Sequence, residues 1–126
     1  MPGNPILSGL RVLVVEDDAL ITMLLEDLLD ECGCRVVGPA ATVAGAQSLI
    51  EDSAFDVALL DLNLGHGQTT YDLAGTLGGR KVPFAFVTGL DALSLRDPYK
   101  TSPTLQKPFR MDELERVLVH LVASRS

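Results

Sequence analysis

Side chains that can do chemistry stand at the ends of four apolar segments in this chain of 126 residues. Glu16 and Asp17 follow the first segment, Asp61 ends the second, Thr88 follows the third and Lys107 follows the fourth. The carboxyl ends of parallel strands meet at one edge of a sheet, which is where open α/β folds bind their ligands. If the segments are parallel strands, these side chains gather in one crevice.

The residue types suit phosphoryl transfer assisted by a divalent cation. Two like charges about 4 Å apart repel by roughly 4 kcal/mol at an effective dielectric of 20, so three carboxylates in one pocket call for a cation. Oxygen ligands favour Mg²⁺, which takes one or two carboxylates together with a phosphate. Asp61 can then attack phosphorus as a nucleophile, while Lys107 and Thr88 neutralise the oxygens of the transferring group. Taken alone, Asp61 could equally start a turn.

The apolar segments have the composition of β-strands. Five of them, bounded by glycine, proline or acidic residues, cover residues 10–15, 35–39, 57–60, 82–87 and 104–106. The segment that ends at Asp61, Val-Ala-Leu-Leu, has no polar residue, which is typical of a strand buried on both faces of a sheet. Such a strand delivers Asp61 to the ligand-binding edge.

Segments with helical periodicity separate the strands. Apolar residues recur at helical spacing over residues 19–29, 43–50, 69–77 and 111–122. Asp18 and Thr42 are expected to cap the first two helices, and Gly78 and Gly79 to end the third. Because strands and helices alternate and crossovers are right-handed, we predict an α/β fold. It is a flavodoxin-like doubly wound sheet of five parallel strands in the order 2-1-3-4-5, with helices on both faces.

Two segments lack a clear pattern. Residues 1–9 contain two prolines and two glycines and are expected to form a flexible leader before a single domain at residues 10–126. Residues 90–103 contain Pro98 and Pro103 among scattered leucines, so at most one or two helical turns fit. Few buried contacts imply a low opening energy. We therefore expect residues 90–103 to be the moving part of any switch.

Composition excludes several functions. Seventeen acidic against ten basic residues give a net charge of -7, the wrong sign for binding the phosphates of a nucleic acid. The sequence has no run of 18 apolar residues and no signal-peptide pattern, so we expect a soluble, cytoplasmic protein that binds no membrane. Cys32 and Cys34 form one CxC pair without a partner cluster, which favours structural cysteines over metal or redox use.

Four motifs in sequence order, VLVVEDD, LLDLNL, FVTG and QKPF, resemble those of response-regulator receiver domains. The resemblance extends from residue 10 to about residue 122. It implies that Asp61 accepts a phosphoryl group, that Asp17 and the backbone carbonyl of Asn63 ligate Mg²⁺ together with Asp61, and that Glu16 acts through a water molecule.

The resemblance also bears on residues beside the site. Asp18 falls one position beyond the acid pair of the family, so we interpret it as a helix cap. The Lys107–Pro108 peptide bond is expected to be cis, because the lysine must turn back toward the phosphoryl pocket. Thr104 stands where receivers usually carry an aromatic switch residue, three positions before the lysine.

The fourth strand resembles the FAT GUY group of stand-alone receivers, named for Phe-Ala-Thr-Gly-hydrophobic-Tyr. Phe86, Thr88, Gly89 and Leu90 match this motif. Val87 replaces the alanine and Asp91 replaces the tyrosine. With no ring at the switch position, we expect a change of order in residues 90–103 to carry the signal.

The expected function is that of a single-domain response regulator in two-component signal transduction. A histidine kinase or phosphotransfer protein would donate the phosphoryl group. Output would require contact with an unknown downstream protein, because few residues follow the last helix. The protein would catalyse only its own phosphorylation and dephosphorylation, and would be a monomer or weak dimer.

Other functions remain open on the sequence alone. Phosphohydrolases similar to the haloacid-dehalogenase phosphatases also use an Asp nucleophile, but they need an acid two residues later, where this chain has Asn63. A phosphate-independent pseudo-receiver would not need the complete set of acids, threonine and lysine. A calcium loop beginning at Asp61 would require glycine at the position of His66. His66 and His120 are interpreted as solvated.

Overall fold

The computed structural model describes residues 4–89 and 95–124, and a five-stranded parallel sheet lies at its centre. The strands are β1 (Arg11–Val15), β2 (Arg35–Ala40), β3 (Val57–Asp61), β4 (Phe84–Thr88) and β5 (Thr104–Gln106). They pair in the order β2-β1-β3-β4-β5, and all pairs are parallel. The predicted α/β class and strand order are therefore confirmed.

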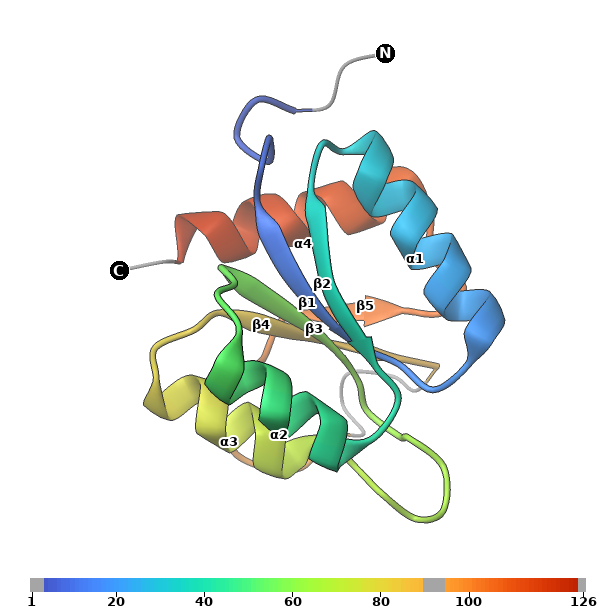
Figure 1. The fold of residues 1–126 in the computed structure, drawn as a ribbon, viewed down its shortest axis with the longest axis vertical. Coiled ribbons are helices and arrows are strands. Elements are labelled where there is room, and N and C mark those ends of the chain that lie inside the picture. Colours follow the sequence, from blue (N-terminus) through green and yellow to red (C-terminus); the bar gives the residue numbers. More distant parts are fainter. Residues whose placement is uncertain (1–3, 90–94, 125–126) are drawn as a thin grey trace.

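Four helices among the described residues cover the two faces of the sheet. α1 (Ala19–Glu31) and α4 (Met111–Ala123) lie on one face, and α2 (Val43–Asp52) and α3 (Tyr71–Gly79) lie on the other (Figure 1). Every residue of β3 is buried. Successive side chains point to opposite faces, so Leu59 packs into one core and Leu60 into the other. This burial fixes β3 in the middle of the fold and leaves Asp61 at the edge.

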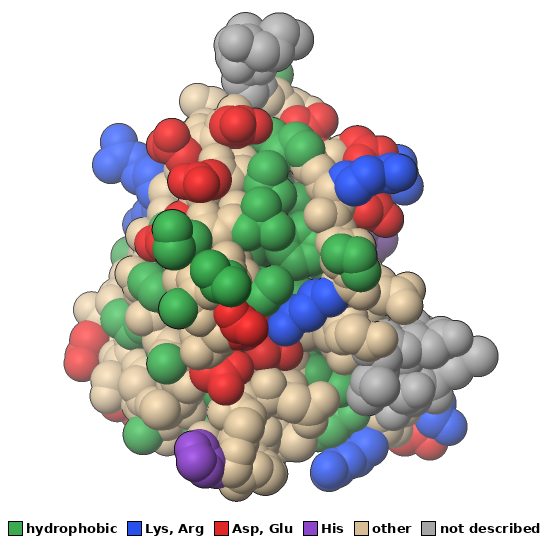
Figure 2. Space-filling view, turned by 90° about the vertical axis from the view of Figure 1, so that its right-hand side faces the viewer, with side chains coloured by type: hydrophobic (Ala, Val, Ile, Leu, Met, Phe, Trp, Pro, Cys, Tyr) green, Lys and Arg blue, Asp and Glu red, His purple; other side chains and the backbone are tan. Residues whose placement is uncertain are grey.

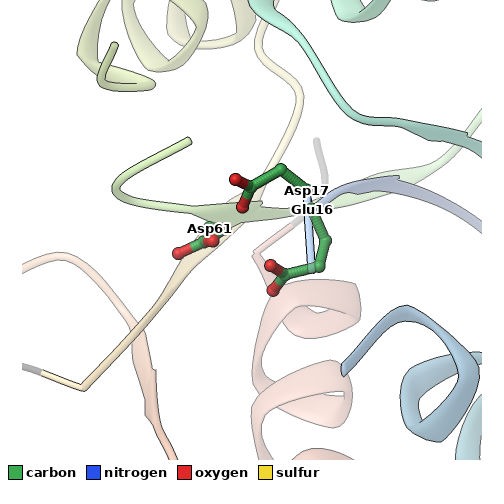
Figure 3. Close-up of side chains that lie close together, drawn as sticks. All are labelled: Glu16, Asp17 and Asp61. Carbon is green, nitrogen blue, oxygen red and sulfur yellow. The ribbon is translucent and has the colours of Figure 1, made fainter. Parts of the chain in front are cut away.

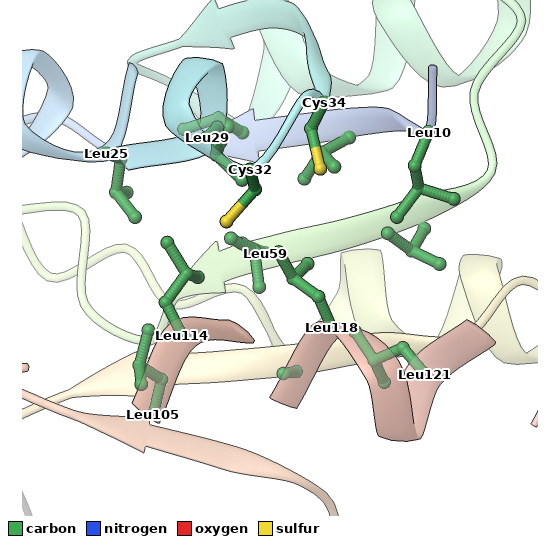
Figure 4. Packing of buried hydrophobic residues seen from close by; sticks show 14 of the residues in the cluster. Leu10, Leu25, Leu29, Cys32, Cys34, Leu59, Leu105, Leu114, Leu118 and Leu121 are labelled. Atoms are coloured by element: carbon green, nitrogen blue, oxygen red, sulfur yellow. The ribbon is translucent and has the colours of Figure 1, made fainter. Parts of the chain in front are cut away.

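The two cysteines belong to the core between the sheet, α1 and α4 (Figure 4). Both are buried and free, and Cys32 Sγ lies 3.7 Å from Met111 Sδ. Burial raises the pKa of the Cys34 thiol to about 12. A buried, protonated thiol is a poor nucleophile and metal ligand, so the structure supports a packing role for this pair.

The first two helices begin at the predicted caps. Asp18 Oδ1 accepts hydrogen bonds from the amides of Leu20 and Ile21 at 2.9 and 3.2 Å. Thr42 Oγ1 accepts one from the amide of Gly45 at 3.0 Å. These bonds satisfy amides that the first helical turn leaves without partners. The predictions for both caps are confirmed.

The third helix runs two residues further than we predicted. Gly78 and Gly79 lie inside α3, and Arg80 follows as its C-cap. The left-handed residue beyond the helix is Lys81, with φ of 60°. Glycine lowers helix propensity, but here it does not end the helix, because Lys81 makes the turn instead.

The described part of the predicted leader packs against the domain. Leu7 is fully buried in the α1–α4 core, and its carbonyl accepts a hydrogen bond from Cys34 Sγ at 3.6 Å. The amide of Gly9 donates to the carbonyl of Gly33 at 2.7 Å. Residues 4–9 are thus held by an apolar side chain and by backbone bonds, which differs from the loose segment we expected.

The predicted moving segment falls partly outside the described residues, because residues 90–94 are not described. The remainder has more buried contacts than we predicted. Leu95 is 2% exposed, and the Tyr99 ring stacks on the Tyr71 ring with centroids 5.7 Å apart. The Arg96 guanidinium lies 4.5 Å from the centre of the Tyr71 ring. The expected scarcity of buried contacts is therefore wrong for Leu95 and Tyr99, whereas most of the other residues from 96 to 103 are exposed.

Candidate functional site

The predicted acids come together at the carboxyl edge of the sheet. Glu16 and Asp17 directly follow β1, and Asp61 is the last residue of β3. β1 and β3 are paired, with Val15 opposite Leu60, so the residues that follow are neighbours. One carboxylate oxygen from each acid lies within 4.8 Å of the others. The three side chains point toward one another (Figure 3).

Lys107 reaches the same cluster from the end of β5. Its Nζ lies 3.2 Å from Glu16 Oε1 and 3.4 Å from Asp61 Oδ1. The backbone amide of Lys107 donates to the carbonyl of Thr88 at 2.8 Å, which ties the ends of β4 and β5 together. The Lys107–Pro108 peptide is cis, as we predicted. Thr88 itself ends β4 and is 2% exposed.

The electrostatics of the cluster favour a proton or a cation on Asp61. Burial, together with hydrogen bonding to Glu16 and the charge of Glu16, raises the pKa of Asp61 from its ordinary value of 3.8 to about 7. The charge of Lys107 and a hydrogen bond from the backbone amide of Asn63 lower the pKa of Asp61, but by less. Burial alone would lower the pKa of Lys107. The charges of Asp61 and Glu16 and hydrogen bonds to both outweigh that effect, so the pKa of Lys107 lies above its ordinary value.

The donor set fits a hard divalent cation. The cluster offers carboxylate oxygens, the ligands that Mg²⁺ prefers. Glu16 Oε2 accepts a hydrogen bond from the Asp18 amide at 3.1 Å. Glu16 Oε1 is buried 3.2 Å from Lys107 Nζ and has no other polar partner among the described residues. A buried oxygen in this state has capacity left for a cation or its water.

Asn63 follows Asp61 by two residues. Its backbone amide donates to Asp61 Oδ1 at 3.4 Å, and its backbone also forms an isolated antiparallel bridge with Thr69. The residue is exposed beside the carboxylates. The predicted ligand role of its carbonyl stays a prediction.

Thr70 is a site residue that the sequence reasoning missed. It is fully buried, and its Oγ1 donates to the carbonyl of Asp61 at 3.0 Å. Its amide donates to the carbonyl of Leu62 at 3.1 Å. A threonine just before a helix is usually interpreted as a cap, but Thr70 makes no side-chain cap bond to α3. It holds the backbone of Asp61 instead.

The remaining predicted positions lie outside the cluster. Asp18 is exposed and caps α1. His66 is exposed in the loop after β3, and His120 is exposed on α4. These positions agree with the solvated roles we expected.

The site opens onto a face of the molecule where charged and hydrophobic side chains lie close together (Figure 2). Figure 2 views the side on which the strands end, where acidic side chains gather beside a basic one near a strip of hydrophobic side chains. Of the acids, Asp17 is exposed, whereas Glu16 and Asp61 are buried. α1 starts three residues after Glu16 and leaves three large apolar side chains exposed: Leu20 by 75%, Met23 by 59% and Leu24 by 40%.

None of the described helices has the length and apolar character needed to cross a membrane.

The chain is similar to several known proteins. Residues 12–119 match the family described as response regulator receiver domain. The chain is 34% identical over 126 residues to the sensor histidine kinase AruS of Pseudomonas aeruginosa, covering 93% of this chain. It spans only 12% of the length of AruS.

Two solved structures of SdrG also match. The solution structure of SdrG from Sphingomonas melonis Fr1 is 40% identical, with a TM-score of 0.81, and the match covers 90% of this chain and 97% of SdrG. The solution structure of the BeF3-activated conformation of SdrG from Pseudomonas melonis Fr1 is 41% identical, with a TM-score of 0.79. This match covers 91% of this chain and 98% of that SdrG chain.

Proposed function

Because the chain belongs to the response regulator receiver domain family, whose members are signalling proteins, we propose that it accepts a phosphoryl group on Asp61 and signals by protein contact. The observation that carries this proposal is the convergence of Asp61, two further acids and Lys107 at one edge of the sheet. The donor is a phosphohistidine of a histidine kinase or phosphotransfer protein. The function lies in two-component signalling in the cytoplasm.

The chemistry is an in-line transfer. An Asp61 carboxylate oxygen attacks phosphorus, the bond from phosphorus to the donor nitrogen breaks, and the imidazole leaves with that electron pair. Lys107 Nζ, already 3.4 Å from Asp61 Oδ1, neutralises the negative oxygens of the transferring group. The Thr88 hydroxyl, at the end of the adjacent strand, donates a hydrogen bond to them. The product is an acyl phosphate on Asp61.

We propose that Asp17, Asp61 and the Asn63 carbonyl hold Mg²⁺, with Glu16 acting through water. When bound, the ion supplies positive charge to the phosphoryl oxygens. The chain's own contribution is to fix the ligands. Glu16 is held by the Asp18 amide, and the Asp61 carbonyl is held by Thr70. The BeF3-activated conformation of the similar SdrG supports the proposed phosphorylation of this chain, because BeF3 mimics a phosphoryl group.

The exposed apolar side chains of α1 are the proposed contact for the phosphodonor. Leu20 and Met23 are 75% and 59% exposed, and α1 begins beside the acids. A histidine that delivers a phosphoryl group must approach Asp61 from this face. Apolar side chains at its rim provide an area that association can bury.

Incubation with a small phosphodonor and Mg²⁺, followed by intact-mass analysis, tests the proposal. The unaltered protein should gain the mass of one phosphoryl group, and Asp61→Asn should gain none. Asp18→Asn serves as the matched control, because Asp18 caps a helix, and it should still be labelled. Failure of the unaltered protein to gain mass with any small phosphodonor or kinase would favour a phosphate-independent adaptor.

A further inference from the structure

The loop between β3 and α3, residues 62–70, is held at both ends. The amide of Leu62 donates to the carbonyl of Val87 at 3.0 Å, and the Thr70 bonds described above close the other end. Within the loop, the amide of Leu64 donates to the carbonyl of Gln68 at 2.9 Å. The Leu64 side chain is 4% exposed. These contacts give the loop little freedom to shift as a whole.

The tip of this loop has three consecutive residues in the left-handed region. Gly65, His66 and Gly67 have φ of 74°, 51° and 75°. The two glycines therefore have nearly the same positive φ, but their surroundings differ. A Cβ at Gly65 would lie 3.1 Å from Asp17 Oδ2, whereas a Cβ at Gly67 would have no atom within 4 Å. Gly65 is the one that faces the acidic cluster.

We propose that Gly65 is a positioning residue for the metal site. Having no side chain, it leaves the space in which the Asp17 carboxylate takes up its ligand position. This inference rests on the proposed function, because it concerns the same Mg²⁺ ligand. It adds a residue that contacts neither the metal nor the phosphoryl group and acts through Asp17.

The effect should depend on whether the metal is bound. In the metal-free protein Asp17 is exposed, so its carboxylate can rotate away from an added methyl group. Mg²⁺ demands near-ideal octahedral geometry with ligand distances of about 2.0 to 2.1 Å. A carboxylate that ligates the ion cannot yield in the same way. An alanine at Gly65 should therefore weaken Mg²⁺ binding while changing the metal-free fold no more than an alanine at Gly67 does.

The experiment compares Gly65→Ala with Gly67→Ala in a calorimetric titration with Mg²⁺. Both variants carry the same left-handed strain, so their difference isolates the contact with Asp17. We expect Gly65→Ala to lower the Mg²⁺ affinity by about tenfold, the lower end of the effect of residues that orient metal ligands. Gly67→Ala should stay close to the unaltered protein, and both variants should unfold at similar denaturant concentrations without metal.

Equal Mg²⁺ affinities of the two variants would overturn the role of Gly65 and leave the proposed function intact. Lack of Mg²⁺ binding by the unaltered protein would overturn both. A Gly65→Ala variant that does not fold without metal, while Gly67→Ala does, would also overturn the role of Gly65, because the exposed Asp17 carboxylate can rotate away from the methyl group.

Discussion

Replacing Asp61 with asparagine should stabilise the metal-free protein at neutral and alkaline pH. Asp61 is 6% exposed, and its pKa is raised from 3.8 to about 7. The folded protein therefore binds this proton more tightly than the unfolded chain does. The stability associated with the protonated form is complete below about pH 4 and is lost as the pH rises to about 7. Above that pH the ionised carboxylate destabilises the fold.

The size of this stabilisation follows from the shift in the pKa of Asp61. About three pKa units correspond to a loss of about 4 kcal/mol at pH 8. At pH 5 between about one and two kcal/mol of that loss is already present, so the advantage of Asp61→Asn should grow by about 2 to 3 kcal/mol between the two pH values. The raised pKa of Asp61 already includes the opposing attraction of Lys107, whose Nζ lies 3.4 Å from Asp61 Oδ1.

Urea denaturation of both proteins at pH 5 and pH 8, with a chelator present, measures this difference. Repeating the pH 8 measurement with Mg²⁺ provides the control, because a bound cation offsets the charge of Asp61 and should narrow the gap. A difference in stability that does not change with pH would refute the reasoning. So would an Asp61→Asn variant less stable than the unaltered protein at pH 8.

Three further predictions concern other residues of the site and the segment after β4. Asp17→Asn should weaken Mg²⁺ binding strongly in a calorimetric titration, whereas Asp18→Asn should weaken it little, and equal losses would contradict the division between ligand and cap. Thr70→Val should lower the free energy of unfolding by about 1–3 kcal/mol, because it leaves a buried carbonyl unpaired, and an unchanged denaturation midpoint would contradict the role of its hydroxyl. Amide exchange across residues 90–103 should slow when Mg²⁺ and a phosphoryl mimic are added, and equal protection in both states would exclude an order change there.

The parts of the fold that the sequence predicts are those set by local pattern. The apolar run before Asp61 is typical of a strand buried on both faces, and it forms β3 in the middle of the sheet. Polar residues that interrupt such runs mark strand ends, and parallel topology brings the ends together. This reasoning predicted the positions of the acids and Lys107. The start of the first helical pattern predicted the cap at Asp18.

The features that the sequence did not predict depend on contacts between distant residues. Leu7 looks like part of a loose leader, yet the core formed by α1 and α4 buries it. Tyr99 lies in an irregular segment, but its ring stacks on Tyr71, which is 28 positions earlier in the chain. The closeness of Gly65 to Asp17 likewise depends on two loops that are far apart in the sequence. Hydrophobic periodicity cannot predict such contacts, because it reflects only the spacing of apolar residues within one helix or strand.

Locating the phosphoryl group on the chain tests the central claim most directly. After incubation with a phosphodonor and Mg²⁺, reduction with borohydride converts an acyl phosphate on aspartate to homoserine, which peptide mass spectrometry can place. The account predicts homoserine at position 61 and unmodified peptides at positions 17 and 18. Homoserine at another acid, with position 61 unmodified, would contradict it.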